Sequence, residues 1–268
     1  MTCKNPITMR KNQPDEITVP CGKCTACRVQ RSREWSIRIL HELQTWKHSA
    51  FVTLTYDDEH LPENNSLSKE DLTKYIKRLR RDLDNEQRKM KYFAAGEYGE
   101  QYGRPHYHLL LLGVGWTEPE LINENWLDKN GNPIGRVDIG SVTYQSARYV
   151  ADYMQKTDDA AKQLYDDLGL ERPFKVQSKG LGLEWIKQYG TIIKEDGYIS
   201  YKGIKMAIPR YYLSKIDHVA MPTSQKSRMY LIKHTKELEK YDMSWNDESI
   251  QSELNWKSKL NLKKKGAL

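Results

Sequence analysis

Hydrophobic and polar residues follow regular patterns over short stretches of the chain, and these patterns predict strands and helices. Residues 51–56 (FVTLTY) alternate and are rich in β-branched and aromatic side chains, which is typical of a strand. Residues 68–84 carry an apolar residue every three or four positions and predict a helix capped by Ser68. Residues 92–98 and 106–112 are again strand-like, and the second contains four consecutive leucines.

The order of these elements predicts the architecture of the central part. A helix over residues 118–127 and a strand over residues 135–142 complete the series strand, helix, strand, strand, helix, strand. This series is the split βαβ arrangement, a mostly antiparallel sheet with helices packed on one face. We therefore expect an α+β fold with a ferredoxin- or RRM-like core, whose opposite sheet face is free to carry a site.

Further elements are predicted on both sides of this core. Residues 1–20 show little periodicity and predict an irregular arm, whereas residues 28–48 predict a helix with interspersed arginines. Further helices are expected at residues 160–168 and 183–189, a hairpin strand at residues 198–206, and a charged helical tail from residue 224. We divide the chain into an N-terminal arm with a cysteine cluster and a basic helix (1–48), a core (49–160) and a helical, basic C-terminal extension (161–268).

Charge and aromatic content favour a polyanionic partner. Lys and Arg exceed Asp and Glu by 43 to 36, a net charge of +7. The chain has 17 Tyr and 7 Trp against 3 Phe, and such amphipathic rings suit base stacking. The sequence contains no long apolar run, no secretory signal and no GxxxxGK[ST] motif, so we expect a soluble intracellular protein without membrane contact or a nucleotide-driven motor.

Candidate chemistry begins at two histidines. Side chains alternate along a strand, so His106 and His108 project from the same face, opposite to Tyr107. The glycine-bearing segment 99–104 has the length of a hairpin loop, which brings Glu97 close to both imidazoles. One carboxylate and two imidazoles with open coordination positions suit a divalent ion that acts on an oxygen substrate. The alternative is that the two histidines simply mark a half-exposed strand.

Cysteines are concentrated near the N-terminus. Cys21, Cys24 and Cys27 have CxxCxxC spacing, and Cys3 is available as a fourth ligand. Four thiolates commonly hold a structural zinc ion, so a zinc site is one interpretation. The other is that these are reduced, small residues that pack at the start of a helix.

Two tyrosines lie in a predicted helix after the last core strand. Within residues 145–156, Tyr149 and Tyr153 are four positions apart and share one face, and Lys156 follows on the same side. A pair of amphipathic tyrosines at a helix–core boundary is the simpler interpretation. Together with a metal bound by Glu and two His, however, these phenols suggest phosphodiester chemistry, in which the ion polarises a phosphate for attack by tyrosine.

The three patterns occur in the order of the motifs of the HUH endonucleases that initiate rolling-circle replication. FVTLTY, Glu97 with His106-Tyr107-His108, and the segment from Tyr149 to Lys156 carry this resemblance. The CGKCTACR start, RPHYH and IPRYY make the chain similar to the replication initiators of microviruses, specifically of the gokushovirus type.

The resemblance implies a nick in single-stranded DNA at the phage origin, a 5′-phosphotyrosyl link and later rejoining of the strand. It implies Mg²⁺ or Mn²⁺ as cofactor, Tyr153 as the first nucleophile and Tyr149 as the second, with Lys156 stabilising the phosphate or positioning the phenol. It also implies a host helicase, a host polymerase and action in the cytoplasm of a bacterial host cell.

Two other functions remain open from the sequence. One is a metal-stabilised nucleic-acid-binding module without catalysis, in which the cysteines and basic helices carry the function. The other is an HUH relaxase or transposase of a mobile element, which would share the site and differ in its DNA partner.

Overall fold

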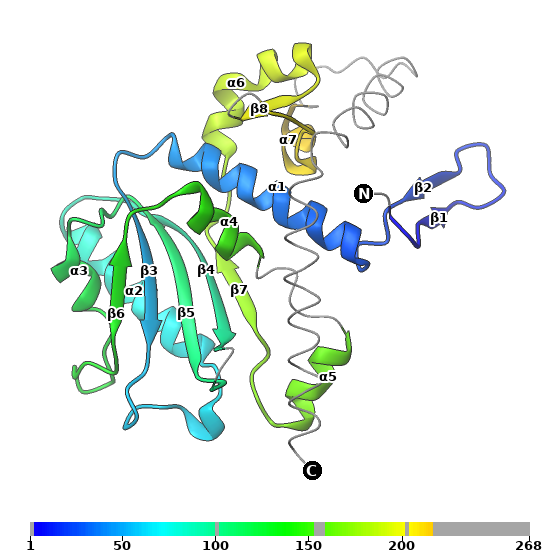
Figure 1. Ribbon diagram of the computed structural model, residues 1–268. Coiled ribbons are helices and arrows are strands. Elements are labelled where there is room, and N and C mark those ends of the chain that lie inside the picture. Colours follow the sequence, from blue (N-terminus) through cyan, green and yellow to red (C-terminus); the bar gives the residue numbers. More distant parts are fainter. Residues whose placement is uncertain (1–2, 100–101, 153–158, 202–203, 217–268) are drawn as a thin grey trace. The chain divides into compact units, whose positions relative to one another are not determined.

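Figure 1 presents a computed structural model, which describes residues 3–99, 102–152, 159–201 and 204–216. The predicted tail helix from residue 224 lies outside these ranges. The chain divides into two compact units. One comprises residues 1–38 and 182–268, and the other comprises residues 39–181.

The second unit is built on a five-stranded antiparallel sheet with the strand order β6-β3-β5-β4-β7. Its strands are β3 (Ser49–Thr55), β4 (Lys91–Tyr98), β5 (Pro105–Leu112), β6 (Val137–Gly140) and β7 (Phe174–Gln177). With α2 (Lys69–Asn85) between β3 and β4 and α3 (Pro119–Asn123) between β5 and β6, the first four strands form the split βαβ arrangement. The predicted α+β class is therefore confirmed, and β7 extends the sheet beyond it.

Helices α2 and α3 cover one face of this sheet (Figure 1). The Ser68 side chain accepts a hydrogen bond from the Asp71 N–H and caps α2, as its position before the helix predicts. The α2 residues at the predicted apolar positions are buried against the strands: Leu72, Ile76, Leu79 and Leu83. Because side chains alternate along β5, Tyr107, Leu109 and Leu111 join this core, and the histidines face the other way.

Helix α4 (Tyr144–Asp152) lies on the opposite face, where it contacts β4 and β5. Ala147, Val150 and Ala151 of α4 are fully buried, which fixes the helix against its surroundings by apolar packing. The short helices η1 (Glu63–Asn65) and α5 (Asp159–Asp167) complete this unit. The sheet face predicted to be open for a site is thus the face that α4 overlies.

The first unit has its own apolar core. It contains α6 (Leu183–Asp196), the hairpin β8 (Ile199–Tyr201) and β9 (Ile204–Met206), α7 (Arg210–Ile216) and the part of α1 (Thr25–Leu43) up to Arg38. Trp185, Tyr212 and Ile37 pack in this core. The helix predicted at residues 183–189 continues through Gly190 to Asp196, because Ile193 adds to the buried stripe and Gly197 ends the helix in a left-handed conformation.

The prediction of an irregular arm at residues 1–20 was wrong. Strands β1 (Ile7–Met9) and β2 (Ile17–Val19) form an antiparallel hairpin in which Ile7 faces Val19. Each strand is three residues long, too short to reveal a period of two. The turn places Arg10 and Asn12 at positive φ, a conformation that the usual glycine signal does not mark.

Two predicted helices have different bounds. The helix expected at residues 28–48 is α1, which ends at Leu43. The helix expected at residues 118–127 stops at Asn123, because the Arg78 guanidinium binds the backbone carbonyls of Leu127 and Asp128 and holds this segment in a loop. Both endings depend on contacts that local periodicity does not contain.

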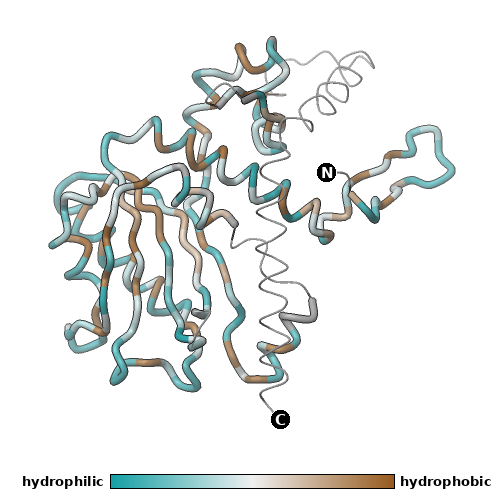
Figure 2. Tube along the Cα trace, in the orientation of Figure 1, coloured by the Kyte–Doolittle hydropathy of each residue, from teal (hydrophilic) through white to brown (hydrophobic). Residues whose placement is uncertain are grey.

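Hydrophobic residues are concentrated on the strands and helices of both units, whereas the turn between β1 and β2 is hydrophilic (Figure 2). Within the described part of the chain, none of the helices combines the length and the apolar character required to span a membrane.

Candidate metal centre and the adjoining tyrosine

Strands β4 and β5 hold the three predicted metal ligands at one end of their hairpin. The register places Glu97 directly opposite His106 and places Ala95 opposite His108. The Gly99 N–H donates to the Arg104 carbonyl and closes the connecting loop at 2.8 Å. The short connection predicted from the sequence therefore brings the carboxylate to the histidines.

A single carboxylate oxygen contacts both imidazoles. Oε1 of Glu97 lies 2.8 Å from Nε2 of His106 and 3.1 Å from Nε2 of His108. Glu97 and His108 are buried, whereas the His106 side chain is 17% exposed, so access to the group is through His106. The three residues form one of two groups in the described part of the chain that could hold a metal ion.

The other nitrogen of each ring contacts an oxygen of the protein. Nδ1 of His106 lies 3.2 Å from the Arg104 carbonyl, and Nδ1 of His108 lies 3.0 Å from Oγ1 of Thr53. A carbonyl can only accept, so His106 carries its proton on Nδ1 when neutral and presents the Nε2 lone pair to the carboxylate side. If Thr53 accepts in the same way, His108 presents Nε2 equally.

This donor arrangement fits a divalent cation. An octahedral ion with ligands at about 2.1 Å has neighbouring ligand atoms roughly 3 Å apart. The two distances from Glu97 Oε1 match that separation, and both Nε2 atoms lie on the same side. Two imidazole nitrogens suit Mn²⁺ better than Mg²⁺, because Mg²⁺ prefers oxygen ligands.

Tyr149 extends this group from α4. Its hydroxyl oxygen lies 3.5 Å from Nε2 of His108, and the two rings meet edge to face with centroids 5.1 Å apart. The Tyr149 side chain is 45% exposed. A phenol that is both accessible to solvent and next to a ligand nitrogen can meet a substrate held at the same cation.

Two other phenols near β5 have a different role. Tyr56 and Tyr107 lie on the α2 side of the sheet, where their hydroxyl groups are 2.9 Å apart. Burial raises the pKa of both phenols well above the ordinary value, so they remain protonated. Their hydrogen bonds to Asp71 and to the Ser68 backbone tie the sheet to the start of α2.

The acidic loop after β3 does not join the metal group among the described residues. Asp57 pairs with His60, and this contact holds the pKa of the Asp57 carboxyl below its usual value. Asp58 pairs with Arg104, whose carbonyl contacts His106. The loop therefore supports the hairpin that carries His106. Of the remaining predicted site residues, Tyr153 and Lys156 lie outside the described residues.

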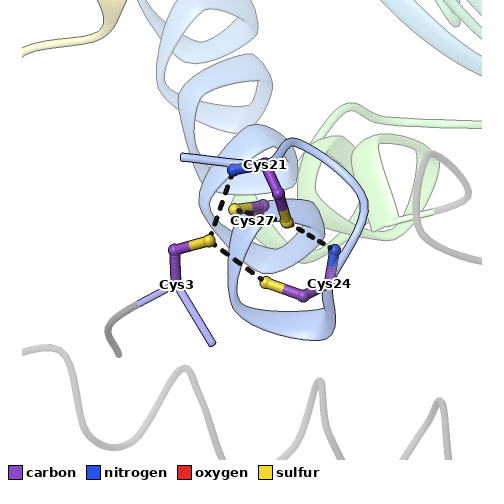
Figure 3. Close-up of side chains that lie close together, drawn as sticks. All are labelled: Cys3, Cys21, Cys24 and Cys27. Atoms are coloured by element: carbon purple, nitrogen blue, oxygen red, sulfur yellow. Dashed lines mark hydrogen bonds between the residues drawn. The ribbon is translucent and has the colours of Figure 1, made fainter. Parts of the chain in front are cut away.

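The four cysteines converge at the start of α1 (Figure 3). Cys21, Cys24 and Cys27 come from one loop and the first turn of the helix, and Cys3 reaches them from a separate segment. Sγ of Cys3 lies 3.8 Å from Sγ of Cys24, and Sγ of Cys21 lies 4.0 Å from Sγ of Cys27. All four thiols are free, so the predicted set forms one cluster.

The sequence interpretation gave no role to Thr53 and Phe51. Thr53 lies opposite His108 in the pairing of β3 with β5, and the Phe51 ring stacks on His108 at 5.7 Å. Both residues belong to the FVTLTY stretch and share a strand face, which periodicity can indicate. Their contact with His108 depends on the pairing of β3 with β5, which periodicity does not give.

We expect Thr53→Val to weaken Mn²⁺ binding about 10- to 100-fold, because the variant removes the oxygen that orients the His108 ring. Isothermal titration of the chain with Mn²⁺ measures this effect. Thr55→Val is the matched control, since Thr55 lies on the same strand face and donates to the Arg136 carbonyl. Equal Mn²⁺ affinity in both variants would assign Thr53 a packing role only.

Comparison with known proteins supports the same interpretation of the motifs. The profile of a family described as replication-associated protein ORF2 matches residues 49–158, which include the metal group and Tyr149. No solved structure matched the chain.

Three viral relatives are similar over most of this chain. Replication-associated protein VP4 of Bdellovibrio phage phiMH2K is 35% identical, with 72% of this chain and 65% of the relative covered. Replication-associated protein ORF2 of Spiroplasma virus 4 is 36% identical, with 76% and 69% covered. Replication-associated protein ORF4 of Chlamydia phage 1 is 29% identical, with 72% and 52% covered.

The chain thus spans about two thirds of the first two relatives and about half of the third. At 36% identity over more than two thirds of the Spiroplasma virus 4 protein, common descent accounts for the similarity. Together with the ordered motifs on one sheet face, this similarity shows that the chain belongs to the family of replication-associated proteins found in small phages.

Proposed function

We propose that this protein nicks and rejoins single-stranded DNA at the replication origin of a small phage through a 5′-phosphotyrosine intermediate. One observation carries the proposal: the Tyr149 hydroxyl lies 3.5 Å from Nε2 of His108, beside a carboxylate–imidazole group that can hold a divalent cation. Nucleophile and cation site thus share one sheet face.

Glu97, His106 and His108 would hold Mn²⁺ or Mg²⁺. When bound, the cation would neutralise charge on a non-bridging oxygen of the scissile phosphate. Glu97 supplies the only formal negative charge within this trio, and the Arg104 carbonyl and Thr53 hydroxyl keep both rings oriented. These residues define where the phosphate is placed relative to Tyr149.

The reaction transfers a phosphoryl group without loss of bond energy. The tyrosine oxygen forms a bond to phosphorus as the phenol proton leaves, and the bond between phosphorus and the 3′ oxygen breaks. The departing oxygen takes up a proton, which leaves a free 3′-OH able to prime synthesis. Attack of a 3′-OH on the phosphotyrosine reverses the step and rejoins the strand.

The family resemblance supports further assignments within this proposal. Tyr153 is the first nucleophile, because Lys156 follows it by three residues as in the family motif. Tyr149 is the second phenol, used in alternate rounds. Lys156 stabilises the phosphate or positions the phenol. Since the relatives are replication-associated proteins of phages, the proposed partners are the origin DNA and a host helicase and polymerase, in the cytoplasm of a bacterial host cell.

A covalent adduct tests the proposal. The full chain is incubated with labelled single-stranded origin DNA of its own genome and Mn²⁺, and the products are separated under denaturing conditions. We expect a labelled protein band that requires Mn²⁺ and disappears with protease. Binding without any adduct would support the non-catalytic module, and cleavage confined to transfer-origin or transposon-end sequences would support a relaxase or transposase.

A further inference from the structure

We propose that Cys3, Cys21, Cys24 and Cys27 bind one zinc ion, and that this ion fastens the β1–β2 hairpin to the N-terminus of α1. The site lies within the first unit and is independent of the proposed nicking reaction. Its role is structural, since four protein ligands leave no open coordination position.

The sulfur positions fit tetrahedral zinc. With Zn–S bonds of about 2.3 Å, the sulfur atoms of a tetrahedral site lie roughly 3.8 Å apart. The observed contacts are 3.8 Å between Cys3 and Cys24 and 4.0 Å between Cys21 and Cys27, and all four sulfurs lie within 4.8 Å of one another. Disulfide bonds require a separation of about 2.05 Å, so the cluster has the dimensions of a metal site instead.

The local backbone is shaped to bring the thiols together. Gly22 has φ 73°, which turns the chain sharply between Cys21 and Cys24. Nη2 of Arg31 donates to the Gly22 carbonyl at 3.1 Å and holds this turn against the helix. Figure 3 shows Cys27 inside the first turn of α1, where it faces the same space as Cys21.

The surroundings favour thiolates. Four thiolates and Zn²⁺ carry a net charge of −2, which lies beside the Arg31 guanidinium and at the positive end of α1. The backbone N–H of Cys21 approaches Sγ of Cys3 at 3.3 Å, and the N–H of Cys24 approaches Sγ of Cys21 at 3.4 Å. Such donors stabilise the charged form of sulfur.

The hairpin needs this attachment. β1 and β2 form a two-stranded sheet of their own, and a hairpin of that kind is marginally stable in water. Ile7 and Met9 are about half exposed, so apolar burial contributes little. Cys3 precedes the hairpin and Cys21 follows it, 18 positions later, so one ion joins both ends of the hairpin to α1.

Metal content gives the first test. Purified full-length chain is expected to contain one zinc per molecule by plasma mass spectrometry, and Co²⁺ exchange is expected to produce thiolate charge-transfer bands. Because the chain has four cysteines and all belong to the cluster, thiol titration reports this site alone. We expect the four thiols to react slowly before chelation and rapidly after it. Four rapidly reacting thiols in zinc-reconstituted protein would overturn the proposal.

Two double variants separate this site from the sheet site. Cys21→Ser with Cys24→Ser is expected to lose the zinc and the cobalt bands. His106→Ala with His108→Ala is expected to keep both. Loss of zinc in the histidine variant alone would place the ion at the sheet and contradict the assignment.

Limited trypsin digestion tests the attachment of the hairpin. Lys4 and Lys23 adjoin cluster cysteines, whereas Arg10 and Lys11 lie at the exposed turn and serve as internal controls. Chelation is expected to increase cleavage after Lys4 and Lys23 at least severalfold and to leave cleavage at the turn nearly unchanged. Equal cleavage after Lys4 and Lys23 with and without zinc would show that the ion does not hold the hairpin.

Discussion

Replacement of Glu97 by glutamine is expected to lower the rate of origin cleavage about 1000-fold. Glu97 Oε1 contacts both histidines, and the amide of glutamine lacks the negative charge that balances a divalent cation. A bound cation contributes several kcal/mol to stabilising developing charge, and each 1.36 kcal/mol corresponds to tenfold in rate. Single-turnover cleavage of labelled single-stranded DNA with Mn²⁺ measures the loss, and calorimetry measures the accompanying loss of Mn²⁺ affinity.

Glu59→Gln is the matched control for this variant. Glu59 is an exposed carboxylate of the acidic loop, so its replacement changes net charge equally without altering the trio. We expect wild-type cleavage from it. Normal cleavage by Glu97→Gln would exclude the trio from the reaction, even if the chain still forms the adduct.

The variant with both Tyr149→Phe and Tyr153→Phe is expected to form no covalent adduct while it retains Mn²⁺ binding. Phenylalanine preserves the packing of the residue 149 ring on His108 and removes only the nucleophilic oxygen. An enzyme without its nucleophile loses nearly all of this activity, so adduct formation should fall at least about 1000-fold. Gel separation of labelled adducts under single-turnover conditions measures the result.

The single variants order the two phenols. Tyr153→Phe is expected to prevent the first adduct, and Tyr149→Phe is expected to permit it but block the second transfer. If Tyr153→Phe leaves the first adduct unchanged, the phenol beside His108 attacks first. Tyr102→Phe is the control, since Tyr102 lies in the loop between β4 and β5 and is 79% exposed. An adduct that persists in the double variant would contradict tyrosine catalysis.

Local patterns in the sequence predicted much of the core and of the metal group. The period of two along β5 was enough to place His106 and His108 on one face, and the short loop was enough to bring Glu97 opposite them. The helical period of α2, with Ser68 as its cap, gave the layer that covers the other face. These features involve residues close together in sequence, so their geometry follows from local rules.

Shorter or less regular elements escaped prediction for physical reasons. The three-residue strands β1 and β2 and the four-residue β7 have too few residues to display a period. The early end of α3 depends on Arg78, which lies in another helix. The family resemblance supplied the reaction class and the roles of the two tyrosines, which periodicity does not contain.

By itself, then, the sequence determined the succession of the core elements, the shared face of the two histidines and the spacing of the cysteines. Only the tertiary structure decided that Thr53 orients His108, across 55 positions, and that the Tyr149 hydroxyl reaches the same ring, across 41. It also decided that Cys3 completes the cysteine cluster. Each of these contacts joins segments whose meeting depends on sheet pairing or helix packing, and no local pattern of residues encodes that meeting.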